Sequence, residues 1–308
     1  MDNLTHSLIG AVLGQAGLRR RTGLAMPALI IAANIPDIDA GCTIYGIESL
    51  AMRRGITHGP IAMLVLPLVL AGGLFWFDRW QARRGTRPEG RLPVHFGWLF
   101  ALCLIGCLTH PAFDWLNNYG IRLLEPFSSQ WFYGDTLFIV DPWLWAILGG
   151  GLWLSLRRER AGKSHWPRAA QAAIAAGLAY VGMNYAIARQ AEAFAAGDVP
   201  YAETNVADAV PIVFWRREVL WRTHSGIYGS IPCTALGCDR YPLAMRKTNF
   251  DPVRLARQAE TDPAMRAFLF WSRLPVVVNR GDGPLLMDQR FMSPRVGDRF
   301  SVRLAPLP

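Results

Sequence analysis

Charged residues are scarce in this chain, at 18% of 308 residues, whereas 52% are hydrophobic. This composition excludes a disordered chain, which would be polar and highly charged. Cysteine is also scarce, and five Cys in 308 residues exclude a small domain built on a disulfide framework. The opening MDNLTHS lacks the basic segment that begins a signal peptide. The amphipathic spacing of an ordinary soluble enzyme is missing too, because the apolar residues come in long blocks.

Four of these blocks predict membrane-spanning helices: residues 60–77, 98–113, 142–156 and 169–187. The first carries no charge over 18 residues, and as a helix it would cover about 27 Å, close to the hydrocarbon thickness of a bilayer. The shorter blocks 7–18 and 24–35 come before them, and each fits a buried helical hairpin, an interfacial pair or a thin span. Twelve Trp suit a bilayer protein, since aromatic side chains collect at the membrane interfaces.

Three basic clusters fix an expected orientation of these segments. They lie at 19–21, 79–91 and 157–163, between apolar blocks, and they contribute to a formal net charge of +9. In a soluble protein such a charge would suggest nucleic acid as a partner. Between apolar blocks it instead predicts cytoplasmic loops, so no nucleic acid partner is expected. The segments after the last span, from about residue 188, then lie outside.

The last part of the chain has a different composition, in which Pro and Gly residues separate short β-rich runs. These runs are 211–216, 219–223, 274–279 and 298–304, and a helical stretch at about 251–272 lies among them. The expected fold is therefore mainly α: a polytopic helical membrane bundle over 1–189, followed by an α+β or β-rich extramembrane domain over 190–308. Cys233 and Cys238 flank a short loop in this domain, and they form either a periplasmic disulfide or two unlinked thiols.

Polar ionisable residues recur at the ends of the apolar blocks, where they are costly and are candidates for function. Under the orientation above they gather at one membrane face, and the candidate metal ligands are His6, Asp37, His58, His110 and Asp114. His110 and Asp114 are four apart, so a helix that continues through Pro111 projects both from one face.

Imidazole and carboxylate ligands suit zinc, with manganese or iron as alternatives, and the set allows one or two ions. The absence of thiolates argues against a closed structural zinc site. Asp39 is expected to bridge the ions, to act as a base or to orient a histidine. Arg54, together with Arg122, is expected to hold a phosphate oxygen. Asp141 is either catalytic or the cap of a helix that begins at Pro142.

Several short motifs together resemble a known family. They are Met1-Asp2-Asn3-Leu4-Thr5-His6-Ser7, Asn34-x-Pro-Asp-x-Asp39, Arg54-Gly-x-Thr-His58, His110-x-x-x-Asp114, Pro126-Phe-Ser128 and Ile139-Val-Asp-Pro142. Over residues 1–190 the chain resembles the bacterial membrane-bound metal-dependent hydrolases, also labelled LexA-binding, inner-membrane-associated hydrolases. That family is distantly similar to zinc-dependent phospholipase C, whose His-x-x-x-Asp pair matches His110 and Asp114. The family commonly has Ser where this chain has Gly59.

The resulting hypothesis is a multi-pass hydrolase of the bacterial inner membrane that cleaves a phosphoester through a metal-activated water. The site and the C-terminal domain would face the periplasm, and the substrate would be a membrane lipid or a lipid-linked molecule. One alternative is a non-catalytic regulatory or scaffold protein with a structural metal site. A transporter is a third possibility, but it would place ionisable groups near mid-membrane rather than at segment ends.

Overall fold

In a computed structural model of the chain, residues 1–199, 201–239, 243–280, 283–292 and 297–304 are described. The chain divides into two compact units. A helical unit comprises residues 1–38 and 54–185, and a second unit comprises residues 39–53 and 186–308. The segment 39–53 therefore groups with the C-terminal part of the chain, although the sequence suggested a single boundary near residue 189.

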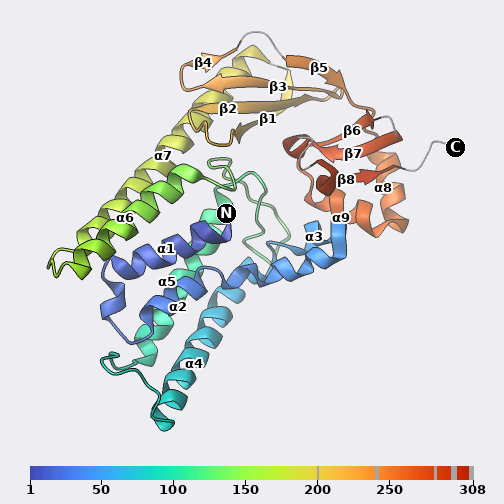
Figure 1. Ribbon diagram of the computed structural model, residues 1–308. Coiled ribbons are helices and arrows are strands. Elements are labelled where there is room, and N and C mark those ends of the chain that lie inside the picture. The colour runs from blue at the N-terminus through green and yellow to red at the C-terminus, as the bar shows by residue number, and fades with distance from the viewer. Residues whose placement is uncertain (200, 240–242, 281–282, 293–296, 305–308) are drawn as a thin grey trace. The chain divides into compact units, whose positions relative to one another are not determined.

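The helical unit is built from helices that Figure 1 labels in chain order. They are α1 (Asn3–Gln15), α2 (Ala25–Ala32), α4 (Ala62–Arg83), α5 (Phe96–Trp115), α6 (Pro142–Arg160) and the first part of α7 (Pro167–Asp198). Local signals set two of the starts: Asp2 accepts hydrogen bonds from the backbone of α1, and Asp141 caps α6, whose first residue is Pro142. Short 3₁₀ segments at Ile35–Glu48 and Ile56–His58 join α2 to α4.

Helix α2 lies at the centre of this unit, in contact with α1, α4 and α5. Leu29 is fully buried, and its carbonyl oxygen would lie 2.7 Å from a Cβ added at Gly10 and 2.8 Å from one added at Gly106. Glycine at these two positions lets α1 and α5 approach the backbone of α2. The blocks 7–18 and 24–35 contribute to α1 and α2, which pack against each other. Their three possible positions relative to a bilayer stay predictions.

Within the described residues, α4 and α5 are the two helices long and apolar enough to cross a membrane. Only 22% of the apolar window of α4 and 39% of that of α5 is buried, so these helices are unlike the core helices of a soluble protein. Helix α5 contains the predicted span 98–113, and α4 contains all but the first two residues of the predicted span 60–77. The other two predicted spans form α6 and α7, which do not meet the same hydropathy test. The reasons are the Arg-rich last turn of α6 and polar residues such as Gln171 and Asn184 within the Ala-rich part of α7.

In its described residues, the second unit contains two antiparallel sheets, the last turns of α7 and three further helices. One sheet has the order β1-β2-β3-β4, with β5 paired to β3, and the other has the order β6-β7-β8. The strands are β1 (Ala202–Ala209), β2 (Arg216–Thr223), β3 (Ile227–Thr234), β4 (Gly237–Cys238), β5 (Leu243–Lys247), β6 (Pro275–Arg280), β7 (Gly283–Asp288) and β8 (Ser301–Arg303). The helices are α3 (Ser49–Met52), which packs against α9 (Pro263–Trp271), and α8 (Pro252–Thr261).

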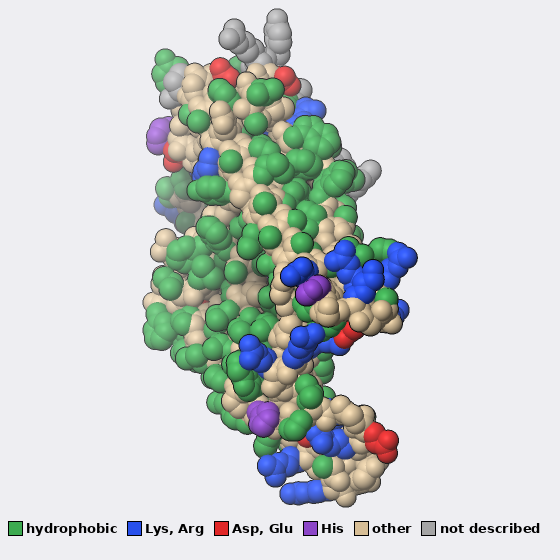
Figure 2. All heavy atoms as spheres, turned by 90° about the vertical axis from the view of Figure 1, so that its left-hand side faces the viewer, with side chains coloured by type: hydrophobic (Ala, Val, Ile, Leu, Met, Phe, Trp, Pro, Cys, Tyr) green, Lys and Arg blue, Asp and Glu red, His purple; other side chains and the backbone are tan. Residues whose placement is uncertain are grey.

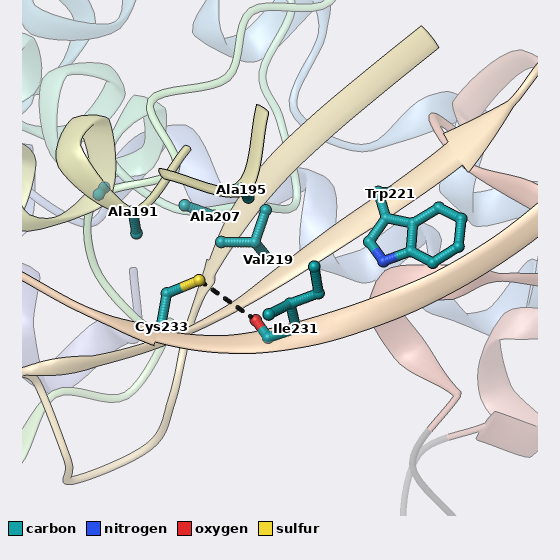
Figure 3. Close-up of a cluster of buried hydrophobic side chains, with 8 residues drawn as sticks. Ala191, Ala195, Ala207, Val219, Trp221, Ile231 and Cys233 are labelled. Carbon is teal, nitrogen blue, oxygen red and sulfur yellow. Dashed lines mark hydrogen bonds between the residues drawn. The ribbon is translucent and has the colours of Figure 1, made fainter. Parts of the chain in front are cut away.

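The last turns of α7 pack on the first sheet rather than ending near residue 187 as expected. Ala188, Ala191 and Ala195 recur at helical spacing and are fully buried against side chains of β1, β2 and β3 (Figure 3). The same cluster holds Cys233, which forms a disulfide with Cys238 across the β3–β4 hairpin. Of the two possibilities left open for these cysteines, the structure shows the paired one.

The expected C-terminal β structure is present, but several boundaries differ. Residues 211–215 form no strand, and β2 begins only at Arg216, because Pro211 and the positive φ of Ile212 (69°) interrupt extended pairing. The predicted helix 251–272 divides into α8 and α9 at Asp262, which ends one helix and caps the next before Pro263. Strands β1, β3, β4, β5 and β7 were not predicted, because polar residues or Gly and Pro weaken the alternating pattern in them.

Acid is expected to destabilise the second unit through Asp288, which is fully buried. Burial works to raise the pKa of this carboxyl group, but the Arg290 charge and hydrogen bonds from Arg290, Ser272 and Leu274 outweigh it and lower the pKa to about 2. A lowered folded-state pKa contributes stability that is present above the unfolded value of 3.8 and is lost as the pH falls through 2. The contribution is about 2 kcal/mol.

The measurement is urea unfolding of the full chain at pH 5 and at pH 3. The variant Asp288→Asn should be less stable at pH 5 and should lack this part of the pH dependence. An unchanged pH dependence in the variant would contradict the assignment.

Candidate metal centre

Four residues bring one ligand atom each to a common point in the helical unit. Asp37, His58, His110 and Asp114 place an imidazole nitrogen or a carboxylate oxygen within 4.8 Å of one another. Asp37 follows α2, His58 precedes α4, and the other two come from the last turns of α5. Helix α5 continues through Pro111, so His110 and Asp114 project from one face as their spacing predicted.

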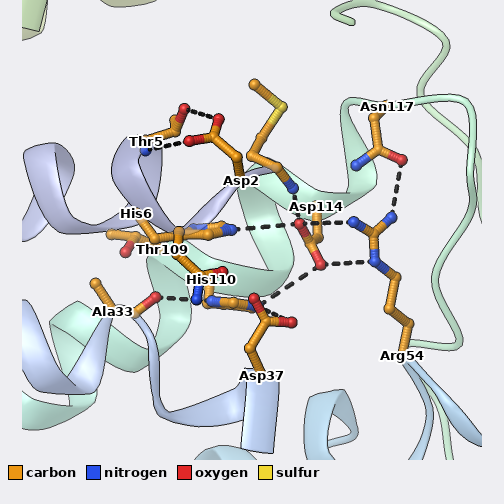
Figure 4. A network of polar contacts seen from close by, with 12 residues as sticks. Asp2, Thr5, His6, Ala33, Asp37, Arg54, Thr109, His110, Asp114 and Asn117 are labelled. Carbon is orange, nitrogen blue, oxygen red and sulfur yellow. Dashed lines mark hydrogen bonds and ion pairs between the residues drawn. The ribbon is translucent and has the colours of Figure 1, made fainter. Parts of the chain in front are cut away.

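Asp114 lies between His6, His110 and Arg54 (Figure 4). Its carboxylate faces three histidines, His58 being the third. Its Oδ2 atom is 3.5 Å from His58 Nε2 and 3.6 Å from His110 Nε2, and its Oδ1 atom is 3.4 Å from His6 Nε2. His110 Nε2 is also 3.6 Å from Asp37 Oδ1. These separations exceed ordinary hydrogen bonds. The three separations among Asp37, His58, His110 and Asp114, at 3.5–3.6 Å, match the edge of a tetrahedron around one zinc ion, about 3.3–3.6 Å for bonds of about 2.0–2.2 Å. The other pairs of ligand atoms lie within 4.8 Å.

The other ring nitrogen of two histidines has a hydrogen-bond partner. His110 Nδ1 lies 2.7 Å from the carbonyl oxygen of Ala33, and His58 Nδ1 lies 2.9 Å from Thr57 Oγ1. A carbonyl oxygen can only accept, so His110 Nδ1 carries a proton, and Nε2 is the ring nitrogen left to bind an ion. This pattern is typical of metal-binding histidines, whose orientation is fixed by such contacts.

His6 lies beside the four residues rather than among them. Its ring stacks on that of His110 with centroids 3.9 Å apart, and it is fully buried. Burial lowers the pKa of His6 to about 4, so the imidazole is neutral at pH 7. The amino group of Met1 also donates a hydrogen bond to Asp114 Oδ1. Of the five predicted ligands, the structure brings four to one point and places His6 at the opposite oxygen of Asp114.

Asp37 is the one member of the group whose side chain is partly exposed, at 10%, whereas those of the other three are fully buried. Burial works to raise its pKa, but the contact with His110 outweighs that effect, and the pKa of Asp37 lies below its ordinary value. This carboxylate is therefore ionised at neutral pH and can act as a metal ligand.

Arg54 is buried against Asp114 and does not present a free guanidinium to a substrate. Its Nε donates to Asp114 Oδ2 at 2.9 Å, and its two Nη atoms donate to Asp114 Oδ1 and Asn117 Oδ1. The guanidinium also lies 4.7 Å from the centre of the Tyr119 ring. These contacts make Arg54 a positioning residue for Asp114, which corrects the expectation that it holds a phosphate oxygen.

The remaining predicted site residues lie elsewhere. Asp39 belongs to the second unit and pairs with Arg53, with Oδ1 3.9 Å from Nε. Asp141 caps α6 through Leu144 N at 2.9 Å and accepts a hydrogen bond from Tyr180. The capping role that the sequence allowed for Asp141 is thus present. Arg122 pairs with Glu125 at 2.7 Å.

Asn117 is a member of this network that the sequence reasoning missed. Its Oδ1 atom accepts from Arg54 and from the backbone of Tyr119, and the residue is fully buried. Thr57, which orients His58, was part of a quoted motif but received no role. The available signal for Asn117 was its place three residues after Asp114, at the end of an apolar helix where polar residues are costly.

Gly59 lies directly after His58 and leaves no room for a side chain. A Cβ added there would lie 1.9 Å from the backbone carbonyl oxygen of Glu125, which cannot move as a side chain could. We therefore expect Gly59→Ala to lower the stability by about 1–3 kcal/mol and to displace His58. Thermal unfolding and metal analysis of the purified chain measure both effects. Gly182→Ala is the control, since no atom lies within 4 Å of its added Cβ, and equal behaviour of the two variants would refute the expectation.

Comparison with known proteins gives one match. A family model described as YdjM inner membrane protein matches residues 1–191. No curated protein and no solved structure matches the chain. The match supports the membrane-associated family that the motifs indicated. The hydrolase activity and the similarity to zinc-dependent phospholipase C remain predictions.

Proposed function

The chain belongs to the YdjM inner membrane protein family, and on that premise we propose that it is an integral-membrane metal-dependent hydrolase. Its substrate class is a phosphoester in a lipid or lipid-linked molecule. The observation that carries the proposal is the convergence of His58 Nε2, His110 Nε2 and two carboxylates at the spacing of ligands to one ion. The fixed Nδ1 contacts of both histidines support ligation through Nε2.

The ligand chemistry favours a catalytic ion over a structural one. The group offers nitrogen and oxygen atoms, whereas closed structural zinc sites are typically rich in thiolates. A divalent ion bound there would polarise a phosphoester and make an activated water available at neutral pH. Neighbouring residues position the ligands. Arg54 donates to both oxygens of Asp114, Ala33 orients His110, and Thr57 orients His58. Asp37, being partly exposed, lies on the side from which a substrate can approach.

Apolar side chains next to the ligands support a lipid substrate. Ile38 follows Asp37 and is 59% exposed, and Ile56 precedes His58 and is 69% exposed. Leu4 and Ile61, close in sequence to His6 and His58, are also exposed. Large apolar side chains around a polar site are unfavourable in water but suit a bilayer interface or an acyl chain.

The two ends of α5 support a periplasmic site. The metal ligands lie at its last turns, and the basic clusters lie near its first residue, Phe96. These ends are separated by about 30 Å, the length of a 20-residue helix. Because basic loops stay in the cytoplasm, the ligands would lie at the outer face of the inner membrane. The Cys233–Cys238 disulfide favours the same side for the C-terminal domain, since the periplasm is oxidising.

Metal analysis and hydrolysis by one protein preparation test the proposal. The full chain is purified in detergent, stripped with a chelator and reloaded with zinc or manganese. We expect about one ion per chain in the wild type and at least about a tenfold loss of affinity in His110→Ala and His58→Ala. His95→Ala, outside the group, is the control and should bind normally.

Hydrolysis is measured with a fluorogenic phosphodiester in mixed phospholipid micelles. We expect turnover by the loaded wild type and none by the two ligand variants. If the wild-type protein bound no metal, the proposal of a metal-dependent hydrolase would be refuted. A wild type that binds metal tightly but hydrolyses no phosphoester would favour the non-catalytic alternative with a structural ion.

A further inference from the structure

A hollow of about 380 Å³ lies at the end of the helical unit that carries the basic clusters. Arg19 and Arg20 line one part of it, and Leu24, Met26, Pro27 and Leu92 line the rest. The lining therefore joins two cationic groups to an apolar wall. It lies at the opposite end of α5 from the candidate metal centre.

Hydrogen bonds place this hollow at the level where a candidate membrane span begins. Gly23 N donates to the carbonyl oxygen of Pro93 at 3.0 Å, and His95 N donates to Thr22 Oγ1 at 2.8 Å. Helix α5 begins with the next residue, Phe96. The end of a spanning helix lies near the boundary between hydrocarbon and headgroups, so the hollow is at the depth of lipid phosphates.

The two arginines are held in place by one tryptophan. The guanidinium carbons of Arg19 and Arg20 lie 4.9 and 4.6 Å from the centre of the Trp166 ring. Arg19 also bonds to Gln15 and Glu159, whereas Arg20 is exposed. Stacking on an aromatic ring fixes a guanidinium at little further entropic cost when it binds an anion.

More positive charge surrounds the hollow. The last turn of α6 carries Arg157, Arg158 and Arg160, and Arg157 lies 5.5 Å from the centre of the Trp153 ring. Figure 2 shows Lys and Arg side chains gathered in groups on this face, while hydrophobic side chains cover much of the helical unit around them. Glu159 in the same turn pairs with Arg19, but the charge here is mainly positive. A mainly positive field with aromatic rings beside it favours an anion at the membrane surface.

We propose that this hollow is a binding site for an anionic phospholipid. The phosphate is held by Arg19 and Arg20, and the first part of an acyl chain lies along Leu24, Met26, Pro27 and Leu92. A free phosphate would use only the arginines and leave the apolar wall unused. A zwitterionic lipid carries a cationic group in its headgroup, and the positive charge around the hollow would repel that group. This site is independent of the metal centre and of the proposed hydrolysis.

The test measures binding of dioctanoyl phosphatidylglycerol to the full chain in a neutral detergent by calorimetry. Dioctanoyl phosphatidylcholine and inorganic phosphate are the comparison ligands. We expect the wild type to prefer phosphatidylglycerol over both. Arg19→Gln/Arg20→Gln should weaken its binding by about 30-fold, the effect of two surface cations at a membrane. Leu92→Trp, which keeps every charge but fills the hollow, should weaken it as well.

The matched control is Arg257→Gln/Arg266→Gln, which removes two exposed arginines from the second unit. This variant should bind like the wild type. Equal weakening by both double variants would show a diffuse charge effect and overturn the site. Equal binding of inorganic phosphate, or normal binding by Leu92→Trp, would overturn the lipid as its occupant. Unchanged unfolding temperature and metal content in Arg19→Gln/Arg20→Gln keep the result separate from folding and from the metal centre.

Discussion

Replacing Asp114 with asparagine is expected to abolish metal binding and to lower the stability by about 3–5 kcal/mol. The substitution removes the carboxylate that faces His6, His58 and His110. It also leaves the guanidinium of Arg54, buried to 4% exposure, without its counter-charge. Both effects arise in one fully buried residue, and metal analysis and thermal unfolding in detergent measure them separately.

The double variant Asp114→Asn/Arg54→Gln separates the ligand from the ion pair. It restores charge balance, so we expect it to regain much of the lost stability while still binding no metal. If Asp114→Asn kept its metal, Asp114 would be no ligand. If the double variant were as unstable as the single one, the Arg54 charge would not be the source of the instability.

The second large effect is expected from Gly106→Leu, one turn before His110 in α5. A Cβ at Gly106 would already lie 2.8 Å from the carbonyl oxygen of Leu29 and 2.9 Å from the Cβ of Ala32. A leucine must push α2 away, which breaks the hydrogen bond between His110 Nδ1 and the carbonyl oxygen of Ala33. We expect a loss of about 1–3 kcal/mol or more from overpacking and about a 10–100-fold weaker metal affinity.

Gly97→Leu provides the matched control for this prediction. It makes the same substitution in the same helix, but nothing lies within 4 Å of the added Cβ. It should unfold at or above the wild-type temperature, because leucine favours a helix over glycine. Normal metal affinity in Gly106→Leu would show that close packing of α2 on α5 is not required for the centre.

Local spacing predicted the parts of the site that depend on one helix. The interval of four between His110 and Asp114 was sufficient, because a helix that continues through Pro111 fixes their common face. His58 and Asp37 were identified by their positions at the ends of apolar blocks, since ionisable groups are costly there. The structure brings these residues together at the end of α5 away from the basic clusters, as the charge pattern indicated.

Roles that depend on tertiary contacts could not be predicted in the same way. Asp39 lies two residues after Asp37, yet the chain has entered the second unit by that point. The sequence predicted that Arg54 binds a phosphate oxygen. Its actual partner, Asp114, is 60 residues away in sequence, so local spacing could not reveal the pair. In the second unit, the polar strand β1 shows little alternation of its own, since its pairing with β2 rather than its composition makes it a strand.

The segment 39–53 has a consequence for where the chain can be divided. The chain passes from one unit to the other at 38/39, 53/54 and 185/186, so three covalent connections join them. Two of these crossings adjoin Asp37 and Arg54, the ligand and the holder of Asp114. A chain cut after residue 191 would therefore keep the α3 segment while losing α9, the helix on which it packs.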